Sequence, residues 1–396
     1  MSKAVIKNKG NSLAETKKIN RILIKNIIFR NDNITRNDIS LLLELTLPTI
    51  TTNINEMMAE GMLEEIPFQS SGYKTAGRKP SAISFRADLA YAIGVELGPY
   101  ATHIVMIDMK GNIIAEREGE RAKDDYSKML QSLSEQISSF ILPGRRILGI
   151  GIGLPGFIES STGVIRSNLR EGWTGRHLSE DLQRIVGYPV LIDNNVRLRA
   201  LGYDMSVKNS GFDTFAYFYM SKGIACPLIM KNDMVSGFTA GAGEIGQNIL
   251  AVEGGQKKTL DDLGSEKAIL EACRSMNDQG RLLSGEEDLT DWDICDVLRY
   301  QVKDEEVERI VSNAIEYMGL GLSHVVNLMN PGLVVVDSHL FSREENREKF
   351  KIAARKHFYG LNEDEVSIAF VPYEASRGAK GAAYHIIKEF LLESEI

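Results

Sequence analysis

The sequence predicts an α/β protein in which a small, mostly helical head precedes a body of two α/β lobes. Three observations lead to this fold class. Three helical patterns and two strand-like runs fill the head, a fresh series of strands starts at residue 91, and a similar strand–turn–strand pattern starts again near residue 214. We therefore divide the chain into head, wing and linker, first lobe and second lobe, at residues 1–71, 72–90, 91–205 and 206–396.

The composition is that of a globular protein, and the charge is unevenly distributed. Of 396 residues, 43% are hydrophobic and 25% are charged, and no apolar run reaches the roughly 18 residues of a membrane span. Residues 1–90 carry 13 Lys and Arg against 9 Asp and Glu, which leaves 33 against 45 for the rest. A mildly basic head favours contact with a polyanion. Three widely spaced cysteines and the lack of a signal-peptide pattern fit a reducing cytoplasm.

Two helices with clear boundary signals are predicted at the start of the head. Residues 15–30 place apolar side chains at near-helical spacing, with Lys and Arg between them. Thr35 can cap a second helix over residues 36–45, with Asp38 three residues further on as in a capping box. That helix is predicted to bury Ile39, Leu42 and Leu43.

A third helix and a two-stranded wing complete the head. Thr46 can cap a helix over residues 47–60, which has Pro48 in its first turn and stops at Gly61. The strand-like runs MLEEIPF and SAISF follow, joined by a loop rich in Gly, Ser and basic residues. Three helices and two strands in this order predict a winged helix-turn-helix, whose third helix has the size to enter the major groove of DNA.

The head therefore offers candidate contacts to double-stranded operator DNA. Threonine and asparagine side chains can contact base edges, and basic side chains can contact phosphates or the minor groove. The candidates on the third helix and at its cap are Thr46, Thr49, Thr51, Thr52 and Asn55. The basic candidates are Arg36, Arg78 and Lys79, together with Lys17, Lys18 and Arg21. The third helix carries no Lys or Arg, so a three-helix module that binds protein is the alternative.

The body repeats one theme of strands and helices. An apolar strand, a turn and an alternating strand start at residue 91, and a helix follows. The run RILGIGIGLPGFIESSTGVI then predicts a buried strand, a glycine-rich loop and a hairpin. The pattern TFAYFYMSKGIACPLIM starts the second half in the same way. Two such halves with a cleft between them are typical of the actin-like, or RNase H-like, sugar-kinase fold, in which ligands bind where the halves meet.

Five segments, in order along the body, resemble the ROK family of repressors, open reading frames and sugar kinases. They are GIGIGLPGFIESSTGVIRSNLREGW, YPVLIDNNVRLRALG, GFTAGAGEIGQ, LGLGLSHVVNLMNPGLVVVD and RGAKGAA. The head is similar to the winged helix of ROK repressors of the xylose or N-acetylglucosamine type, with GRKP at the family's linker motif. The resemblance implies a two-lobed ROK body and a homodimer, with a tetramer left open.

The residues that ROK kinases use for catalysis are replaced in this chain. Asn195 stands where the family has its catalytic Asp, and an amide cannot take a proton from a sugar hydroxyl. Pro99, Lys222 and Asp337 stand in the loops that cradle the nucleotide in the kinases. Gln247 stands at the family's zinc-binding His, and the cysteine run after it is missing. We expect no catalysis, no cofactor and no metal.

The same resemblance implies a sugar-binding site in the body. Amides and carboxylates beside an apolar wall are suited to bind neighbouring sugar hydroxyls. The positions that match the family's sugar contacts, or belong to its altered motif, are Asn168, Asn194, Asn195, Glu244, Gln247 and Glu266. The alternatives are a turn or cap role for each Asn and a structural hydrogen bond for Glu244.

A DNA-binding head on an inactive sugar-kinase body predicts a cytoplasmic transcription regulator, a repressor of carbohydrate-use genes. Its body is expected to sense a small sugar or sugar derivative, and no membrane contact is expected. Two alternatives belong to other classes: a divergent ROK sugar kinase, and a regulator whose body binds a protein partner. Asn195 and Pro99 disfavour the kinase. The sequence neither supports nor excludes the regulator whose body binds a protein partner.

Overall fold

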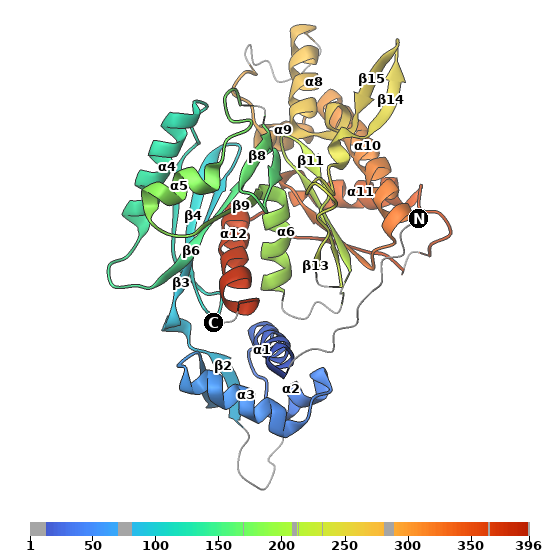
Figure 1. The fold of residues 1–396 in the computed structure, drawn as a ribbon. Coiled ribbons are helices and arrows are strands. Elements are labelled where there is room, and N and C mark those ends of the chain that lie inside the picture. Colours follow the sequence, from blue (N-terminus) through green and yellow to red (C-terminus); the bar gives the residue numbers. More distant parts are fainter. Residues whose placement is uncertain are drawn as a thin grey trace, which may run out of the picture.

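A small head lies at one end of a larger, two-lobed body in the computed structural model (Figure 1). The structure describes residues 13–69, 81–168, 170–207, 212, 214–231, 233–280, 289–362 and 365–394. The predicted DNA contacts Arg78 and Lys79 lie outside these residues. Within them, none of the helices combines the length and the apolar character that crossing a bilayer requires.

The head consists of three helices and a two-stranded wing. Its elements are α1 Leu13–Arg30, α2 Arg36–Leu43, α3 Leu47–Ala59, β1 Leu63–Pro67 and β2 Ser81–Phe85. Thr35 caps α2 and forms a reciprocal capping box with Asp38, while the Thr46 side chain accepts from the Thr49 N–H and caps α3. β1 and β2 pair antiparallel. The predicted winged helix-turn-helix is thereby confirmed.

One apolar core holds the head together and continues into the body. Ile39 on α2 and Ile50, Ile54 and Met57 on α3 are fully buried. The prediction that Leu42 is buried is wrong, because its side chain is 59% exposed. In a helix of two turns, the residues four apart (Ile39 and Leu43) define the inward stripe, and Leu42 lies beside it.

The first lobe is built on a five-stranded mixed sheet with the order β5-β4-β3-β6-β9. Its strands are β3 Tyr91–Leu97, β4 Ala101–Asp108, β5 Ile113–Glu120, β6 Ile147–Leu154 and β9 Val190–Asn194. The other elements are the short helix η1 Ala87–Leu89, the hairpin β7 Phe157–Glu159 and β8 Val164–Ser167, and helices α4 Tyr126–Phe140, α5 Leu178–Val186 and α6 Asn195–Ser206. The strands β3, β6 and β9 are parallel, so their carboxyl ends meet at one edge.

The second lobe is built on a sheet with the order β13-β12-β10-β16-β17, and β11 pairs with β10. Its strands are β10 Phe215–Met220, β11 Ile224–Ala225, β12 Leu228–Met230, β13 Asp233–Met234, β16 Leu333–Asp337 and β17 Ser367–Phe370. A separate hairpin is formed by β14 Ile249–Glu253 and β15 Gln256–Thr259. The helices are η2 Ile245–Gln247, α7 Leu260–Gly264, α8 Glu266–Asp278, α9 Ile294–Gln301, α10 Glu305–Met329, η3 His339–Ser342, α11 Glu344–Arg355, α12 Arg377–Ile387 and η4 Lys388–Leu392.

Two neighbouring helices, α6 and α12, lie between the sheets of the two lobes (Figure 1). α12 comes from the end of the chain, yet it packs against β3 and β6 of the first lobe. α6 packs its Val196 and Ala200 with Phe215 and Tyr217 of β10 in the second lobe. The two helices thus separate the sheets, and residues near their amino termini lie where the lobes meet.

Candidate functional site

Two of the predicted sugar contacts converge on the loop between β6 and β7. Asn168 donates from Nδ2 to the Pro155 carbonyl at 2.7 Å, and Asn194 donates from Nδ2 to the Gly156 carbonyl at 2.9 Å. The Oδ1 of Asn194 also accepts from the first backbone N–H groups of α6, which makes Asn194 the cap of that helix. Both amides therefore shape the loop, and their contact with a sugar remains a prediction.

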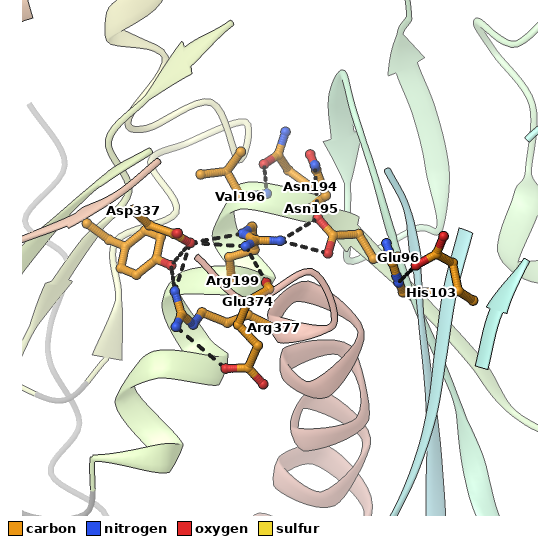
Figure 2. Close-up of polar contacts among 11 residues, drawn as sticks. Glu96, His103, Asn194, Asn195, Val196, Arg199, Asp337, Glu374 and Arg377 are labelled. Carbon is orange, nitrogen blue, oxygen red and sulfur yellow. Dashed lines mark hydrogen bonds and ion pairs between the residues drawn. The ribbon is translucent and has the colours of Figure 1, made fainter. Parts of the chain in front are cut away.

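Asn195 begins α6 and points toward a buried cluster of charges (Figure 2). Its Nδ2 donates to Glu96 Oε1 at 3.4 Å. The guanidinium of Arg199, one turn further along α6, donates to Glu96 Oε2 at 3.0 Å and to Asp337 Oδ2 at 3.1 Å. Arg377 of α12 pairs with the same Asp337 oxygen at 3.0 Å. Glu96 is the last residue but one of β3 and Asp337 ends β16, so this buried ion-pair cluster joins the two lobes.

Each carboxylate of the buried ion-pair cluster is paired with at least one guanidinium group. Glu96, Arg199 and Asp337 are each at most 2% exposed. Burial alone lowers the pKa of Arg199, but the carboxylates of Glu96 and Asp337 outweigh burial and hold that pKa well above its usual range. Tyr217 donates its hydroxyl to Asp337, and its own pKa is raised by burial and by that carboxylate. Both guanidinium groups and the phenol therefore stay protonated at neutral pH.

Glu266, another predicted sugar contact, lies in a second contact between the lobes. Its Oε2 accepts from Tyr100 Oη at 3.1 Å and from Ser221 Oγ at 3.0 Å. Burial raises the pKa of Glu266 to about 7, and the two donated hydrogen bonds offset this only in part. Lys222 Nζ lies 4.7 Å from the centre of the Tyr100 ring. The loops that match the kinases' two phosphate loops therefore contact each other through their side chains.

Glu244 precedes the short helix η2 and Gln247 ends it, close to a carboxylate that the sequence did not single out. Gln247 Nε2 donates to Asp261 Oδ2 at 2.9 Å, and Asp261 Oδ1 accepts from the Ile224 N–H. Burial and then the nearby Asp261 raise the pKa of Glu244, while Arg197 opposes them. In the part of the chain that the structure describes, no three His, Cys, Asp or Glu side chains are grouped as metal ligands.

Sequence reasoning missed the arginines of α6. Arg197 donates to Asp193 Oδ1 at 3.0 Å and to Ser236 Oγ at 2.9 Å, so it joins the end of β9 to the second lobe. Arg199 links the carboxylates of the ion-pair cluster. The available signal was a pair of arginines two residues apart in a segment, NNVRLRALG, that is otherwise mostly apolar or amide. A buried arginine requires a carboxylate or carbonyl partner, and this segment contains no carboxylate of its own.

The predicted DNA contacts lie on and around α3. Thr46, Thr52 and Asn55 are exposed, whereas Thr49 and Thr51 are partly buried. Arg36 donates to Asn55 Oδ1 at 3.2 Å and pairs with Glu65 of the wing at 2.5 Å. Lys17 and Arg21 of α1 are paired with Glu56 and Glu60 at the end of α3. These pairs fix α3 on α1, and the contacts with bases and phosphates remain predictions.

The sequence profile of the ROK family matches residues 92–389. The chain belongs to the ROK family. The xylose repressor of Caldicellulosiruptor bescii is 28% identical over 337 residues, 81% of this chain and 83% of that protein. A glucokinase of Halalkalibacterium halodurans is 24% identical over 259 residues, 62% of this chain and 78% of that protein.

A solved structure shows the same arrangement of head and body. It is described as a ROK family transcriptional regulator, a homologue of the E. coli MLC protein, and has a TM-score of 0.80. The likeness covers 96% of this chain and 97% of that one at 18% identity, which establishes the fold. The predicted family and the predicted fold, a winged helix-turn-helix followed by a two-lobed ROK body, are therefore confirmed.

Proposed function

We propose that this protein is a sugar-responsive transcription repressor that binds operator DNA through its head. The observation that carries the proposal is the combination, in one chain, of a winged helix with a ROK body whose catalytic position is Asn195. The xylose repressor of C. bescii is similar over 81% of this chain, a share larger than the body alone provides. A repressor of this kind acts on cytoplasmic DNA, and we propose the cytoplasm as its location.

The proposed effector is a neutral aldose, with D-xylose as the first candidate because of the name of that relative. Six residues are proposed to contact it. Asn168 and Asn194 lie at the β6–β7 loop, Glu244 and Gln247 at η2, Asn195 beside the ion-pair cluster, and Glu266 in the second contact between the lobes. Carboxylate and amide groups together both accept from and donate to sugar hydroxyls. A homodimer is proposed as well, since two winged helices reading two half-sites is the usual geometry of such repressors.

We further propose that the body has no kinase activity. Glu96 and Asp337 stand in the segments that match the kinases' nucleotide loops, and both are tied to Arg199. The glucokinase relative favours a sugar kinase as the second candidate function. Incubation with ATP and a panel of hexoses and pentoses distinguishes them: we expect no sugar-dependent ADP release. Asn195→Asp is expected to remain inactive, because its new carboxylate would lie beside Glu96 without supplying a phosphate-binding loop. ADP release at ordinary enzyme rates by either protein contradicts this proposal.

Operator binding tests the repressor function directly. Fluorescence anisotropy with DNA from the promoter region of the protein's own operon is expected to give a Kd of about 10⁻⁸ M or tighter at physiological salt. D-Xylose at millimolar concentration is expected to change that Kd about tenfold, in line with typical coupling between two sites. A chain that lacks residues 1–85 is the control and should not bind. Absence of binding by the full chain at low salt, or retained binding by the truncated chain, refutes the assignment.

A further inference from the structure

Helix α6 runs from the lobe junction to the head. Its first turns carry Arg197 and Arg199, which bind carboxylates at the junction. Its last turn carries Asp204, which is 8% exposed and pairs with Arg30 at 2.8 Å. Arg30 is the last residue of α1 in the winged helix. A single helix thus contacts both the lobe junction and the winged helix.

Helix α12 and its continuation η4 connect the same two regions through a separate set of contacts. Arg377, the first residue of α12, pairs with Asp337 in the ion-pair cluster. At the far end, the carbonyls of Leu391 and Ser394 accept from Lys25 Nζ at 2.5 and 2.8 Å. Lys25 lies on α1 and is fully buried. A buried ammonium needs such partners, so this contact fixes the middle of α1 to the end of the body.

The two helices are in backbone contact with each other. A Cβ on Gly381 would lie 1.7 Å from the Leu198 carbonyl oxygen, and a Cβ on Gly202 would lie 2.7 Å from the Arg377 carbonyl oxygen. No side chain fits between the helices at these points, so one cannot slide or tilt without displacing the other. We call this closely packed pair, which lies side by side in Figure 1, the α6–α12 strut.

A cavity borders the amino-terminal half of α1, whereas Lys25 and Arg30 hold its carboxyl-terminal half to the body. A cavity of about 900 Å³ lies between Lys17, Lys18 and Arg21 of α1 on one side and body residues that include Leu89 and Phe390 on the other. Lys17 and Arg21 also hold the end of α3 through Glu56 and Glu60. A rotation of α1 about its fixed half would therefore carry the DNA-reading helix with it.

We propose that the α6–α12 strut transmits the state of the lobe junction to the winged helix, and that Lys25 and Arg30 are the residues that receive it. The proposal rests on the repressor function proposed above. A change at the junction shifts Arg199 and Arg377, the strut moves as a unit, and α1 reorients α3 relative to the operator. Because coupling between two sites is reciprocal, operator binding acts back on the junction through the same two contacts.

A double-mutant cycle tests this route without any effector. Glu96→Gln perturbs the junction, and the pair Lys25→Met with Arg30→Gln removes the two contacts on α1. We expect Glu96→Gln to change the operator Kd at least fivefold in the otherwise unaltered chain, and less than twofold when the contacts on α1 are absent. The proposal is overturned if Glu96→Gln changes the operator Kd by the same factor in both backgrounds. It is also overturned if Glu96→Gln leaves that Kd unchanged in the otherwise unaltered chain.

Two further measurements keep the test decisive. Lys356→Gln removes an exposed ion pair with Glu316, away from the strut, and serves as a control background. In this background Glu96→Gln should still change the operator Kd at least fivefold. If Glu96→Gln fails to fold, Asp337→Asn is used instead to perturb the junction. Hydrogen exchange of α1 gives a readout free of DNA: Glu96→Gln should change protection at residues 20–30, and unchanged protection overturns the proposal. A chain that binds no operator but shows the exchange response refutes the repressor function and leaves the transmission route standing.

Discussion

At the scale of single residues, burial changes the chemistry of side chains whose identity is plain in the sequence. Glu266 was predicted as a sugar contact, and in the structure its carboxyl group accepts from Tyr100 and Ser221 within the lobe junction. Burial raises its pKa to about 7. A carboxyl group with such a pKa is partly protonated at neutral pH, so its contribution to stability depends on pH.

Replacement of Glu266 by Gln should remove that pH dependence. The pKa in the folded protein is above the ordinary value of 4.5. The stabilising effect of proton binding is therefore complete below about pH 4.5 and is lost as the pH rises through 7. Glu266→Gln keeps an acceptor oxygen and stays neutral, so it should be more stable than the wild type at pH 8, by at most about 3 kcal/mol, and similar at pH 5.

Thermal unfolding between pH 5 and 8.5 measures this difference. Glu271→Gln, on the exposed face of the same helix, is the matched control and should show a difference from the wild type that does not depend on pH. Parallel curves for wild type and Glu266→Gln over the whole range would contradict the role assigned to burial.

At the scale of elements, the helix ends of the head were predictable and the packing of α6 and α12 was not. Thr35 and Thr46 cap the helices that the sequence assigned to them, because a cap contacts backbone two or three residues away. The contact between Gly381 and Leu198 joins segments that are far apart in the chain. The sequence contains the glycines of these segments, but it does not reveal which helix packs on each of them.

Gly381→Ala should disrupt this helix pair. The added methyl group would lie 1.7 Å from the Leu198 carbonyl oxygen, a clash that only a displacement of α6 or α12 can relieve. We expect a loss of about 3 kcal/mol or more in the free energy of unfolding, measured with urea. Lys380→Ala, one residue earlier on α12, is the control and should change stability by less than about 1 kcal/mol. Equal stability of the two variants would show that the helices are not in backbone contact.

At the scale of the whole molecule, the head and the body carry net charges of opposite sign. Residues 1–90 hold 13 basic against 9 acidic side chains, while the rest of the chain is strongly acidic with 33 against 45. An acidic body is repelled by DNA, so the approach of the head is favoured over non-specific contact with the lobes. The proposed homodimer would bring two such heads to one operator.

Operator binding should consequently be steeply sensitive to salt. A dimer that neutralises about six phosphates is expected to lose about 10³-fold in affinity between 50 and 200 mM KCl. Anisotropy titrations at four salt concentrations give the slope. Arg36→Gln, which removes one basic side chain beside α3, should reduce the slope, whereas Lys356→Gln on the body should leave it unchanged. A flat dependence would mean that the head does not bind phosphates.

The sequence by itself determined the order of elements in the head and the ROK fold of the body, and its resemblance to the family implied that Asn195 stands at the catalytic position. These features depend on periodicity, on caps and on motifs, which are local in the chain. Only the tertiary structure showed that Arg199 joins Glu96, 103 residues away, to Asp337, 138 residues away. The physical reason is that the packing of the lobes determines which partner a buried charge contacts. The spacing of residues along the chain does not encode that pairing.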